Sequence, residues 1–191
     1  SSTNRAVMRE EQVTLVDEHN AVTGSAPRSV MRRDGLPHRA TYVLVFNEAG
    51  DVFVQRRTGT KDIFPGYLDI CAGGVVQAGE SYDESAEREL QEELGIAGIP
   101  LTPLFEFFYA EQRNRVHGRA YRCVYEGPMK LQEEEVESGE FIAPAQIIER
   151  AATQCVTPDS LYVLTRFLKH TGTQAPFTSR NRKPDSGRGD S

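Results

Sequence analysis

The segment 82–94 constrains the fold most, because it carries the signals for both ends of a helix. Ser81 followed by Glu84 is typical of a capping box at a helix start, and Gly95 is a typical helix stop. Apolar residues recur on one side of this helix, namely Ala86, Leu90 and Leu94. A second side is polar and is expected to face solvent, with Glu84, Glu87 and Gln91. The pattern predicts an amphipathic helix that packs on a sheet.

Three carboxylates occupy the remaining side of this predicted helix. With about 100° per residue and Glu89 at zero, Glu92 falls roughly 60° to one side and Glu93 roughly 40° to the other. Like charges at these spacings destabilise a helix by roughly a few tenths of a kcal/mol per pair, and a bound cation would offset the repulsion. Oxygen ligands favour Mg²⁺, with Mn²⁺ as second choice. The simpler interpretation is a solvated acidic face.

The rest of the chain alternates between strand-like and helix-like composition. Strands are predicted at 13–17, 41–47, 52–56, 104–111, 119–126 and 136–141, with 67–76 extended and 20–24 as a turn. Two further helices are predicted at 144–151 and 158–169. This order of elements favours a mixed α/β sandwich over a doubly wound sheet.

A chain of 191 residues without internal repeats predicts one domain. We place it at residues 13–170, between a polar, flexible segment at 1–12 and a disordered tail rich in Pro, Gly and Ser at 171–191. No apolar run approaches the roughly 20 residues that a membrane-spanning helix needs. The net charge of −6 is concentrated in 80–93 and 133–140. Local acid of this kind favours a cation over a nucleic acid polymer as partner.

The cysteines indicate the compartment. Cys71, Cys123 and Cys155 are odd in number and far apart, so they predict neither a zinc site nor a disulfide framework. A reducing compartment fits best, and a cytoplasmic location is expected. The chain begins with Ser1 rather than Met, so an organelle reached with a targeting segment that was later removed stays open.

Residues 74–96 have the sequence GVVQAGESYDESAERELQEELGI. They match, without a gap, the pattern of Gly, five residues, Glu, seven residues, Arg-Glu, an apolar residue, any residue, Glu-Glu, any residue, Gly and an apolar residue. Few short motifs are this specific. By this segment the chain resembles the Nudix hydrolase family. The resemblance implies an α/β/α sandwich with a mixed β-sheet, and hydrolysis of the diphosphate linkage in a nucleoside diphosphate-type substrate.

The matching positions imply a role for each polar residue of the motif. Glu89, Glu92 and Glu93 would be metal ligands, with the Gly74 carbonyl as a further ligand. Glu80 would support the site. In the implied reaction the metal neutralises the phosphates and lowers the pKa of a bound water, which attacks phosphorus in line. The residues with implied catalytic roles are Arg88, which orients Glu92, together with Glu92, Glu93 and Glu135.

The general base is expected on a later loop or on the motif helix itself. The acidic loop LQEEEVESGEF offers Glu133, Glu134 and Glu135. Glu135 is preferred, because it directly precedes the predicted 136–141 strand, where relatives often place a loop glutamate. A solvated charge run is the alternative interpretation of this loop.

The region before the motif resembles isopentenyl diphosphate isomerase and the bacterial Nudix hydrolases related to it. The likeness rests on His38-Arg39-Ala40-Thr41, Gln55-Arg56-Arg57, Lys61 and Phe64-Pro65-Gly66. The isomerase needs a cysteine closely followed by a histidine, and two glutamates in a later strand. Here Cys71 precedes Ala72-Gly73-Gly74, and residues 113–125 contain no acid. These departures favour hydrolysis, with Cys71 in the core and His38 as a structural histidine.

Two other functions stay open, an isoprenoid-diphosphate isomerase and a catalytically silent diphosphate-binding module. In each case the partner is a small-molecule diphosphate, for which Arg56, Arg57 and Lys61 are candidate binding residues. A homodimer formed through the aromatic strand at 104–109 also stays open.

Overall fold

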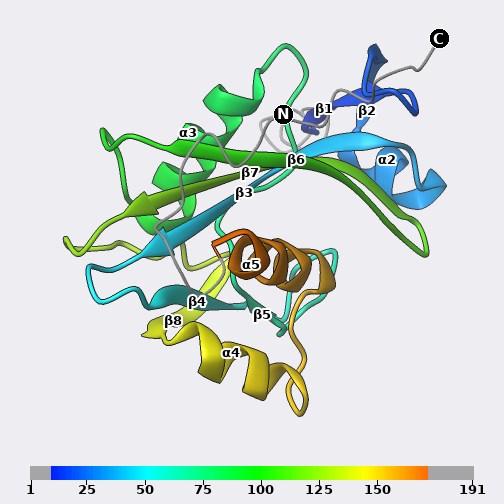
Figure 1. The fold of residues 1–191 in the computed structure, drawn as a ribbon. Helices are drawn as coiled ribbons and strands as arrows, with labels where there is room; N and C mark the ends of the chain where they lie inside the picture. Colours follow the sequence, from blue (N-terminus) through cyan, green and yellow to red (C-terminus); the bar gives the residue numbers. More distant parts are fainter. Residues whose placement is uncertain (1–9, 172–191) are drawn as a thin grey trace, which may run out of the picture.

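A mixed β-sheet with helices on both faces forms the centre of the structure (Figure 1). The computed structural model describes residues 10–171. The strands are β1 (Gln12–Val16), β2 (Val22–Pro27), β3 (His38–Phe46), β4 (Val52–Arg57), β5 (Leu68–Asp69), β6 (Thr102–Glu111), β7 (Asn114–Val124) and β8 (Val136–Ile142). The helices are α2 (Arg28–Asp34), α3 (Tyr82–Leu94), α4 (Pro144–Ala151) and α5 (Pro158–Thr171).

Strand β3 lies at the centre of this sheet. It pairs in parallel with β7 along its whole length, and β7 pairs antiparallel with β6. At its end β3 meets β4, which pairs antiparallel with β5 and β8. The other edge of β3 is bridged by the segment that precedes α3, through Ala40 with Val75 and Val43 with Ala72. This segment therefore brings the start of the sequence motif against the central strand.

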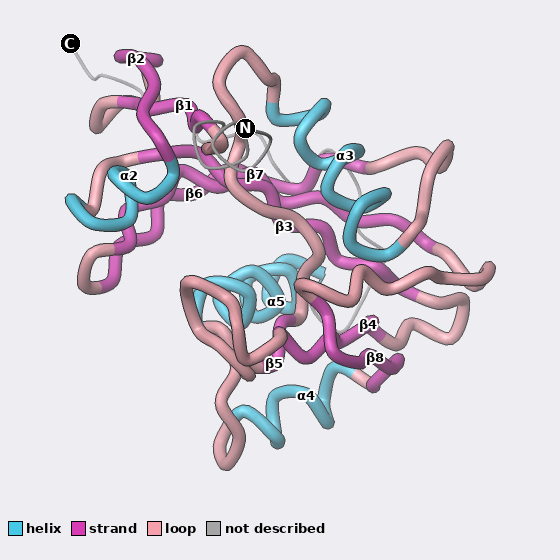
Figure 2. Tube along the Cα trace, turned by 180° about the vertical axis from the view of Figure 1, so that it is seen from behind, coloured by secondary structure: helices cyan, strands magenta, loops and turns pink. Residues whose placement is uncertain are grey.

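Side chains of β3 alternate between two hydrophobic cores, as successive residues of a strand must. Tyr42 and Leu44 face the core that α4 and α5 cover, whereas Val43 and Val45 face the core under α3. Figure 2 shows α3 and α5 on opposite sides of the strands. The predicted α/β/α sandwich with a mixed sheet is thereby confirmed.

Helix α3 has the bounds that its sequence predicts. The Ser81 hydroxyl accepts a hydrogen bond from the Glu84 amide, and the Glu84 carboxylate accepts one from the Ser81 amide. Gly95 adopts a left-handed φ of 69° and ends the helix. The apolar stripe is buried, while Glu84, Glu87 and Gln91 are exposed. The sequence therefore predicts both the length of this helix and its orientation on the sheet.

Strand β2 and helix α2 were not predicted, and the turn expected at 20–24 is wrong from Val22 onward. Most of β2 is exposed, so its residues show no apolar alternation, and pairing with β1 alone defines it. Helix α2 has no side-chain cap and no acidic residue in its first turn. Neither element leaves a local signal of the kind that marks α3.

The flexible segment expected at 1–12 and the tail expected at 171–191 lie mostly outside the described residues. Within the described part, β1 begins at Gln12 and α5 runs through Thr171. None of the helices between residues 10 and 171 has both the length and the apolar character needed to cross a membrane.

The packing of α3 on the sheet gives a stability prediction. Leu90 is 2% exposed in the core under α3, and its neighbour Gln91 is exposed. We expect Leu90→Ala to lower the free energy of unfolding by about 2–5 kcal/mol, because it leaves a cavity. Gln91→Ala, one residue along the same helix, should change it by less than about 0.5 kcal/mol. Urea denaturation measures both, and equal effects would show that α3 is not held by this core.

Candidate metal and phosphate site

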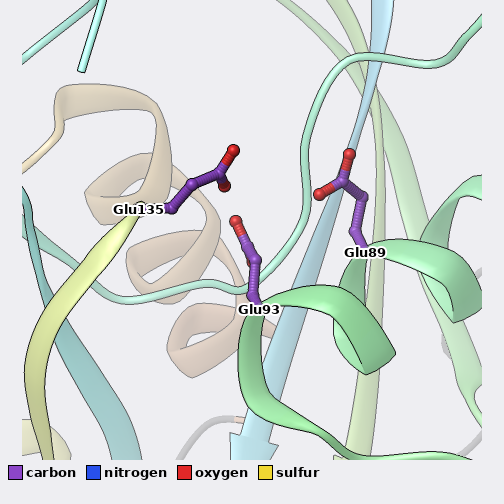
Figure 3. A group of neighbouring side chains, drawn as sticks. All are labelled: Glu89, Glu93 and Glu135. Carbon is purple, nitrogen blue, oxygen red and sulfur yellow. The ribbon is translucent and has the colours of Figure 1, made fainter. Parts of the chain in front are cut away.

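Three carboxylates converge between helix α3 and the start of β8 (Figure 3). Glu89 and Glu93 come from α3, and Glu135 directly precedes β8 (Figure 3). One oxygen from each lies within 4.8 Å of the others. Glu89 and Glu93 are 8% and 4% exposed, and the Glu135 side chain is 34% exposed. Glu133 and Glu134 are exposed, so Glu135 is the member of the acidic loop that faces this cluster.

The turn at Gly73-Gly74 supports the two buried carboxylates. The Gly73 amide donates a hydrogen bond of 2.8 Å to Glu93 Oε2. Gly73 has a φ of +139°, and a Cβ there would overlap the Thr41 carbonyl. A Cβ on Gly74 would lie 2.7 Å from Glu89 Oε1. The Gly74 carbonyl accepts a bond of 2.9 Å from the Thr41 amide and one of 3.4 Å from the Thr41 hydroxyl.

The electrostatics of the cluster favour a bound cation. Burial raises the pKa of Glu89 to about 7, against the charge of Arg88, and the charges of Glu135 and Glu92 raise it further. Burial also raises the pKa of Glu93 well above its usual range, and the neighbouring Glu89 adds to this. A divalent cation would reverse both effects by stabilising the ionised forms. Clustered carboxylate oxygens form the donor set that Mg²⁺ prefers, so these residues fit such an ion.

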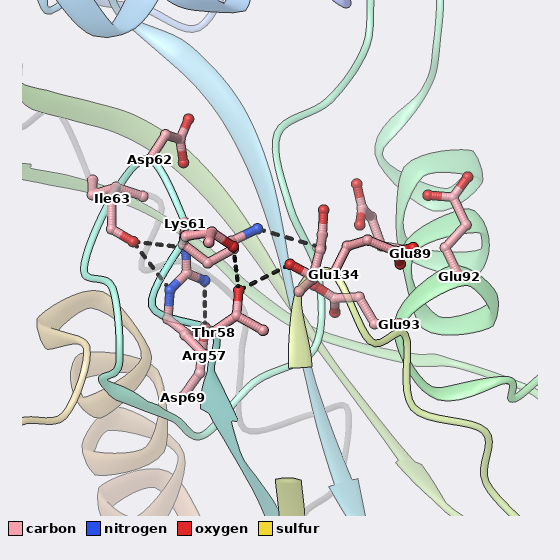
Figure 4. A network of polar contacts seen from close by, with 12 residues as sticks. Arg57, Thr58, Lys61, Asp62, Ile63, Asp69, Glu89, Glu92, Glu93 and Glu134 are labelled. Carbon is pink, nitrogen blue, oxygen red and sulfur yellow. Dashed lines mark hydrogen bonds and ion pairs between the residues drawn. The ribbon is translucent and has the colours of Figure 1, made fainter. Parts of the chain in front are cut away.

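Arg88 connects the carboxylates of the motif. It donates to both oxygens of Glu80, with Nε at 2.7 Å and Nη2 at 3.0 Å. Its Nη1 donates to Glu89 at 3.0 Å and to Glu92 at 3.1 Å. Glu92 is half exposed, on the outer side of α3, and stands apart from the three converging carboxylates (Figure 4). The arginine thus holds the carboxylates of Glu80, Glu89 and Glu92 in one hydrogen-bonded group.

The three basic residues predicted to bind phosphate lie in different places. Lys61 Nζ is 3.3 Å from Glu135 Oε2. Figure 4 shows Lys61 pointing toward Glu89 and Glu93. Arg57 donates to the Ile63 carbonyl and to Asp69 Oδ2, at 2.8 Å and 3.2 Å. Both line the cleft next to the cluster. Arg56 donates to the Gly66 carbonyl and lines a separate groove near β8 and α4.

A cleft of about 80 Å³ extends from Glu89 along β3. Its walls include two cations that no sequence motif indicated, Arg28 and Arg32 of α2. Its floor holds Asp159, whose Oδ2 accepts a bond of 2.8 Å from the Tyr42 hydroxyl. Burial raises the pKa of Asp159, and Asp69 adds to this. These two arginines could be recognised as cleft residues only if α2 were predicted, because this helix places them at the cleft.

Cys71 and His38 are both buried along this cleft. Cys71 is 4% exposed, and burial raises the pKa of its thiol well above the usual range, which disfavours the reactive thiolate. His38 is 2% exposed, and its Nδ1 lies 2.9 Å from the Leu36 carbonyl. Burial, together with the charge of Arg32, lowers the pKa of His38 to about 4, so the ring stays neutral.

The fold and this cluster define an α/β/α domain that presents carboxylates from a helix following a glycine turn. The chain belongs to the NUDIX domain family, whose model matches residues 36–181. It is accordingly a hydrolase of diphosphate bonds. An uncharacterized Nudix hydrolase of Yersinia pestis is 46% identical over 164 residues, which cover 86% of this chain and 89% of the relative. The Nudix hydrolase YfcD of Escherichia coli is also 46% identical, over 86% of this chain and 91% of the relative.

Among solved structures, the DR0079 protein of Deinococcus radiodurans has a similar fold, with a TM-score of 0.73. It is 27% identical, and the match covers 82% of this chain and 98% of that protein. A MutT protein of Methanosarcina mazei matches with a TM-score of 0.61 at 20% identity, which shows likeness of fold alone.

The low pKa of His38 predicts a specific dependence of stability on pH. Its folded pKa of about 4 lies below the unfolded value of 6.5, so the unfolded chain binds the proton first and stability is lost as pH falls from about 6.5 towards 4. Between pH 7.5 and 4.5 this loss is about 2–3 kcal/mol, at about 1.4 kcal/mol per unit. We expect His38→Asn to remove that part of the pH dependence.

Urea denaturation at several pH values measures this effect as the difference between variant and wild type, in which the titration of other groups cancels. The exposed His19 offers the matched control, His19→Asn. An unchanged pH dependence in His38→Asn would mean that the ring accepts a proton without unfolding the protein.

Proposed function

We propose that this protein is a Mg²⁺-dependent hydrolase that cleaves the diphosphate linkage of a nucleoside diphosphate-type substrate by attack of water on phosphorus. The observation that carries this proposal is the convergence of three carboxylates, two of them buried, at one end of a cleft with basic walls. Carboxylates alone would repel a diphosphate, and basic residues alone would bind it without activating water. Their combination suits a substrate that arrives with a divalent cation.

In this proposal Glu89, Glu93 and Glu135 hold the cation, with the Gly74 carbonyl beside them. When bound, Mg²⁺ supplies charge neutralisation of the phosphates and a lowered pKa for water. Mn²⁺ has the same ligand preference and would substitute. Arg88 keeps Glu89 and Glu92 in position through its hydrogen bonds to both. Glu92 acts as a supporting acid from the outer side of the helix.

Glu135 is the proposed general base. It is the most exposed of the three clustered carboxylates, so it can reach a water that enters the cleft. Lys61, at 3.3 Å, holds its side chain in place. The base must lie within about 3 Å of the attacking water, which its position at the edge of the cluster permits. Lys61 and Arg57 then bind phosphate oxygens along the cleft.

The environment of Cys71 argues against isomerase chemistry. Its thiol is part of the core between the sheet and α5, and its proton is held by burial. A general acid or base needs access to the substrate and a pKa near the working pH. Cys71 lies along the cleft, but burial holds the pKa of its thiol far above that range, whereas Glu89 lines the same cleft with a pKa of about 7.

The decisive test is turnover of a panel of nucleotides, nucleotide sugars and dinucleotides with and without Mg²⁺. We expect Glu93→Gln to lower kcat/KM at least about 100-fold, because the metal contributes several kcal/mol to the transition state. Glu87→Gln, on the exposed side of the same helix, should leave kcat/KM unchanged. Turnover that is equally strong in Glu93→Gln would refute the proposal. An isomerised isoprenoid product that is lost in Cys71→Ala but survives in Glu93→Gln would establish the isomerase instead.

Cation binding can be tested without any substrate. A methyl group at Gly74 would displace the Glu89 carboxylate, so we expect Gly74→Ala to weaken Mn²⁺ binding at least about tenfold. Gly24→Ala is the control, because a Cβ there meets no atom within 4 Å. Isothermal titration calorimetry measures both affinities. If Gly74→Ala binds Mn²⁺ as tightly as Gly24→Ala does, the ion is not held against this turn.

A further inference from the structure

Arg32 lies where the cleft opens into a second groove. It lines the cleft beside Glu89 and also the adjoining groove of about 310 Å³. Ile63, Phe64 and Asn114 line both as well. Phe64 has a φ of +50°, a conformation that a bulky side chain rarely adopts outside constrained sites. A ligand that extends from the carboxylate cluster into the groove would pass this guanidinium.

The guanidinium of Arg32 has few partners within the described part of the chain. Its buried Nε has no hydrogen-bond acceptor there, and the nearest carboxylate oxygen, Asp62 Oδ2, is 3.7 Å away. That same oxygen already accepts a bond of 3.0 Å from Arg28 Nε. Although burial opposes it, the bond from Arg28 and the charges of Arg28 and Arg32 lower the pKa of Asp62 to about 2. The two guanidinium groups therefore share Asp62, and Arg28 has a second carboxylate partner, Glu11 Oε2, at 3.4 Å.

This arrangement leaves Arg32 Nε at the cleft wall without a hydrogen-bond acceptor among the described residues, and its counter-charge, Asp62, is distant and shared. The Arg32 side chain is only 22% exposed, and burial, together with the charge of Arg28, lowers its pKa. The other acid near it, Asp159, accepts a hydrogen bond from the Tyr42 hydroxyl. A mostly buried cation without hydrogen bonds destabilises a protein unless a ligand completes its environment. Phosphate oxygens match the planar fork of a guanidinium.

We propose that Arg32 is a specificity-determining residue that binds a phosphate group of the substrate where the cleft meets the groove. The proposal rests on the proposed function, because it assigns a phosphate of that substrate to this position. The remainder of the substrate then continues into the groove along Ile63 and Phe64. Arg28 is already bonded to Asp62 and approaches Glu11, so it supports this position mainly through its charge.

Inorganic pyrophosphate binding to the metal-free full chain tests this subsite. We expect Arg32→Gln to weaken pyrophosphate binding about 10–100-fold, the loss of a hydrogen bond to a charged group. Arg32→Lys keeps the positive charge but loses the paired donors of the planar guanidinium, so its affinity for pyrophosphate should lie between those of Arg32→Gln and the wild type. Arg33→Gln is the matched control, because Arg33 is the next residue of α2, is 70% exposed and bonds to Asp34. It should bind as the wild type does.

Stability without ligand separates this role from a structural one. If Arg32 lacks a partner in the free protein, Arg32→Gln should leave the Tm unchanged or raise it, while abolishing most of the rise in Tm that pyrophosphate causes. A lower Tm for ligand-free Arg32→Gln, failure of this variant to fold, or wild-type pyrophosphate binding in it would overturn the proposal. So would failure of the metal-free wild-type chain to bind pyrophosphate.

The two proposals fail in different ways. Pyrophosphate binding that depends on Arg32, without turnover of any substrate in the panel, would refute the hydrolytic function and leave the phosphate subsite standing. Turnover that depends on Glu93, with pyrophosphate binding independent of Arg32, would support the hydrolytic function and refute the phosphate subsite.

Discussion

The site depends on two like-charged side chains, Glu89 and Glu93, being buried one helical turn apart. The apolar stripe of α3 fixes the rotation of the helix on the sheet, and this rotation carries both carboxylates inward. The Gly73 amide and the Arg88 guanidinium each stabilise one of them. These contacts offset the burial only in part, because the pKa of each carboxyl remains raised. Core packing therefore holds both carboxyl groups where their ionised forms are disfavoured unless a cation binds beside them.

The two glycines make this close approach possible. The segment that carries them bridges to β3 on both sides of the turn, at Ala72 and Val75. Between these bridges the backbone must pass both the Thr41 carbonyl and the Glu89 carboxylate, where any side chain would collide. Hydrogen bonding of the sheet and the position of the carboxylates are thus set by the same few residues. The glycine turn and the carboxylates of α3 contact each other directly, so the motif contains both the turn and the helix in one continuous segment.

Local signals explain what the sequence predicted. The capping box, the stop at Gly95 and the apolar stripe all lie within α3, so its bounds and buried face could be predicted. The helical wheel also separates Glu92 from Glu93: Glu93, at roughly 40°, lies next to the apolar stripe, and Glu92, at roughly 60° on the other side, lies away from it. Grouping the carboxylates on one face concealed this difference. The half-exposed position of Glu92 follows from it.

Contacts between distant segments leave no signal in the residues that make them. The parallel pairing of β3 with β7 was not predicted, and the approach of Glu135 to α3 was expected only through the family resemblance. Helix α2 carries no local signal, so Arg28 and Arg32 remained hidden although they form one wall of the cleft. The structure thereby places clustered carboxylates at one part of the cleft and an arginine without a hydrogen-bond acceptor for its Nε at another. On the proposed function a metal–diphosphate complex satisfies both at once, because its cation binds the carboxylates and its phosphates bind the guanidinium. Either component alone would leave one end uncompensated, so the two are expected to strengthen each other's binding.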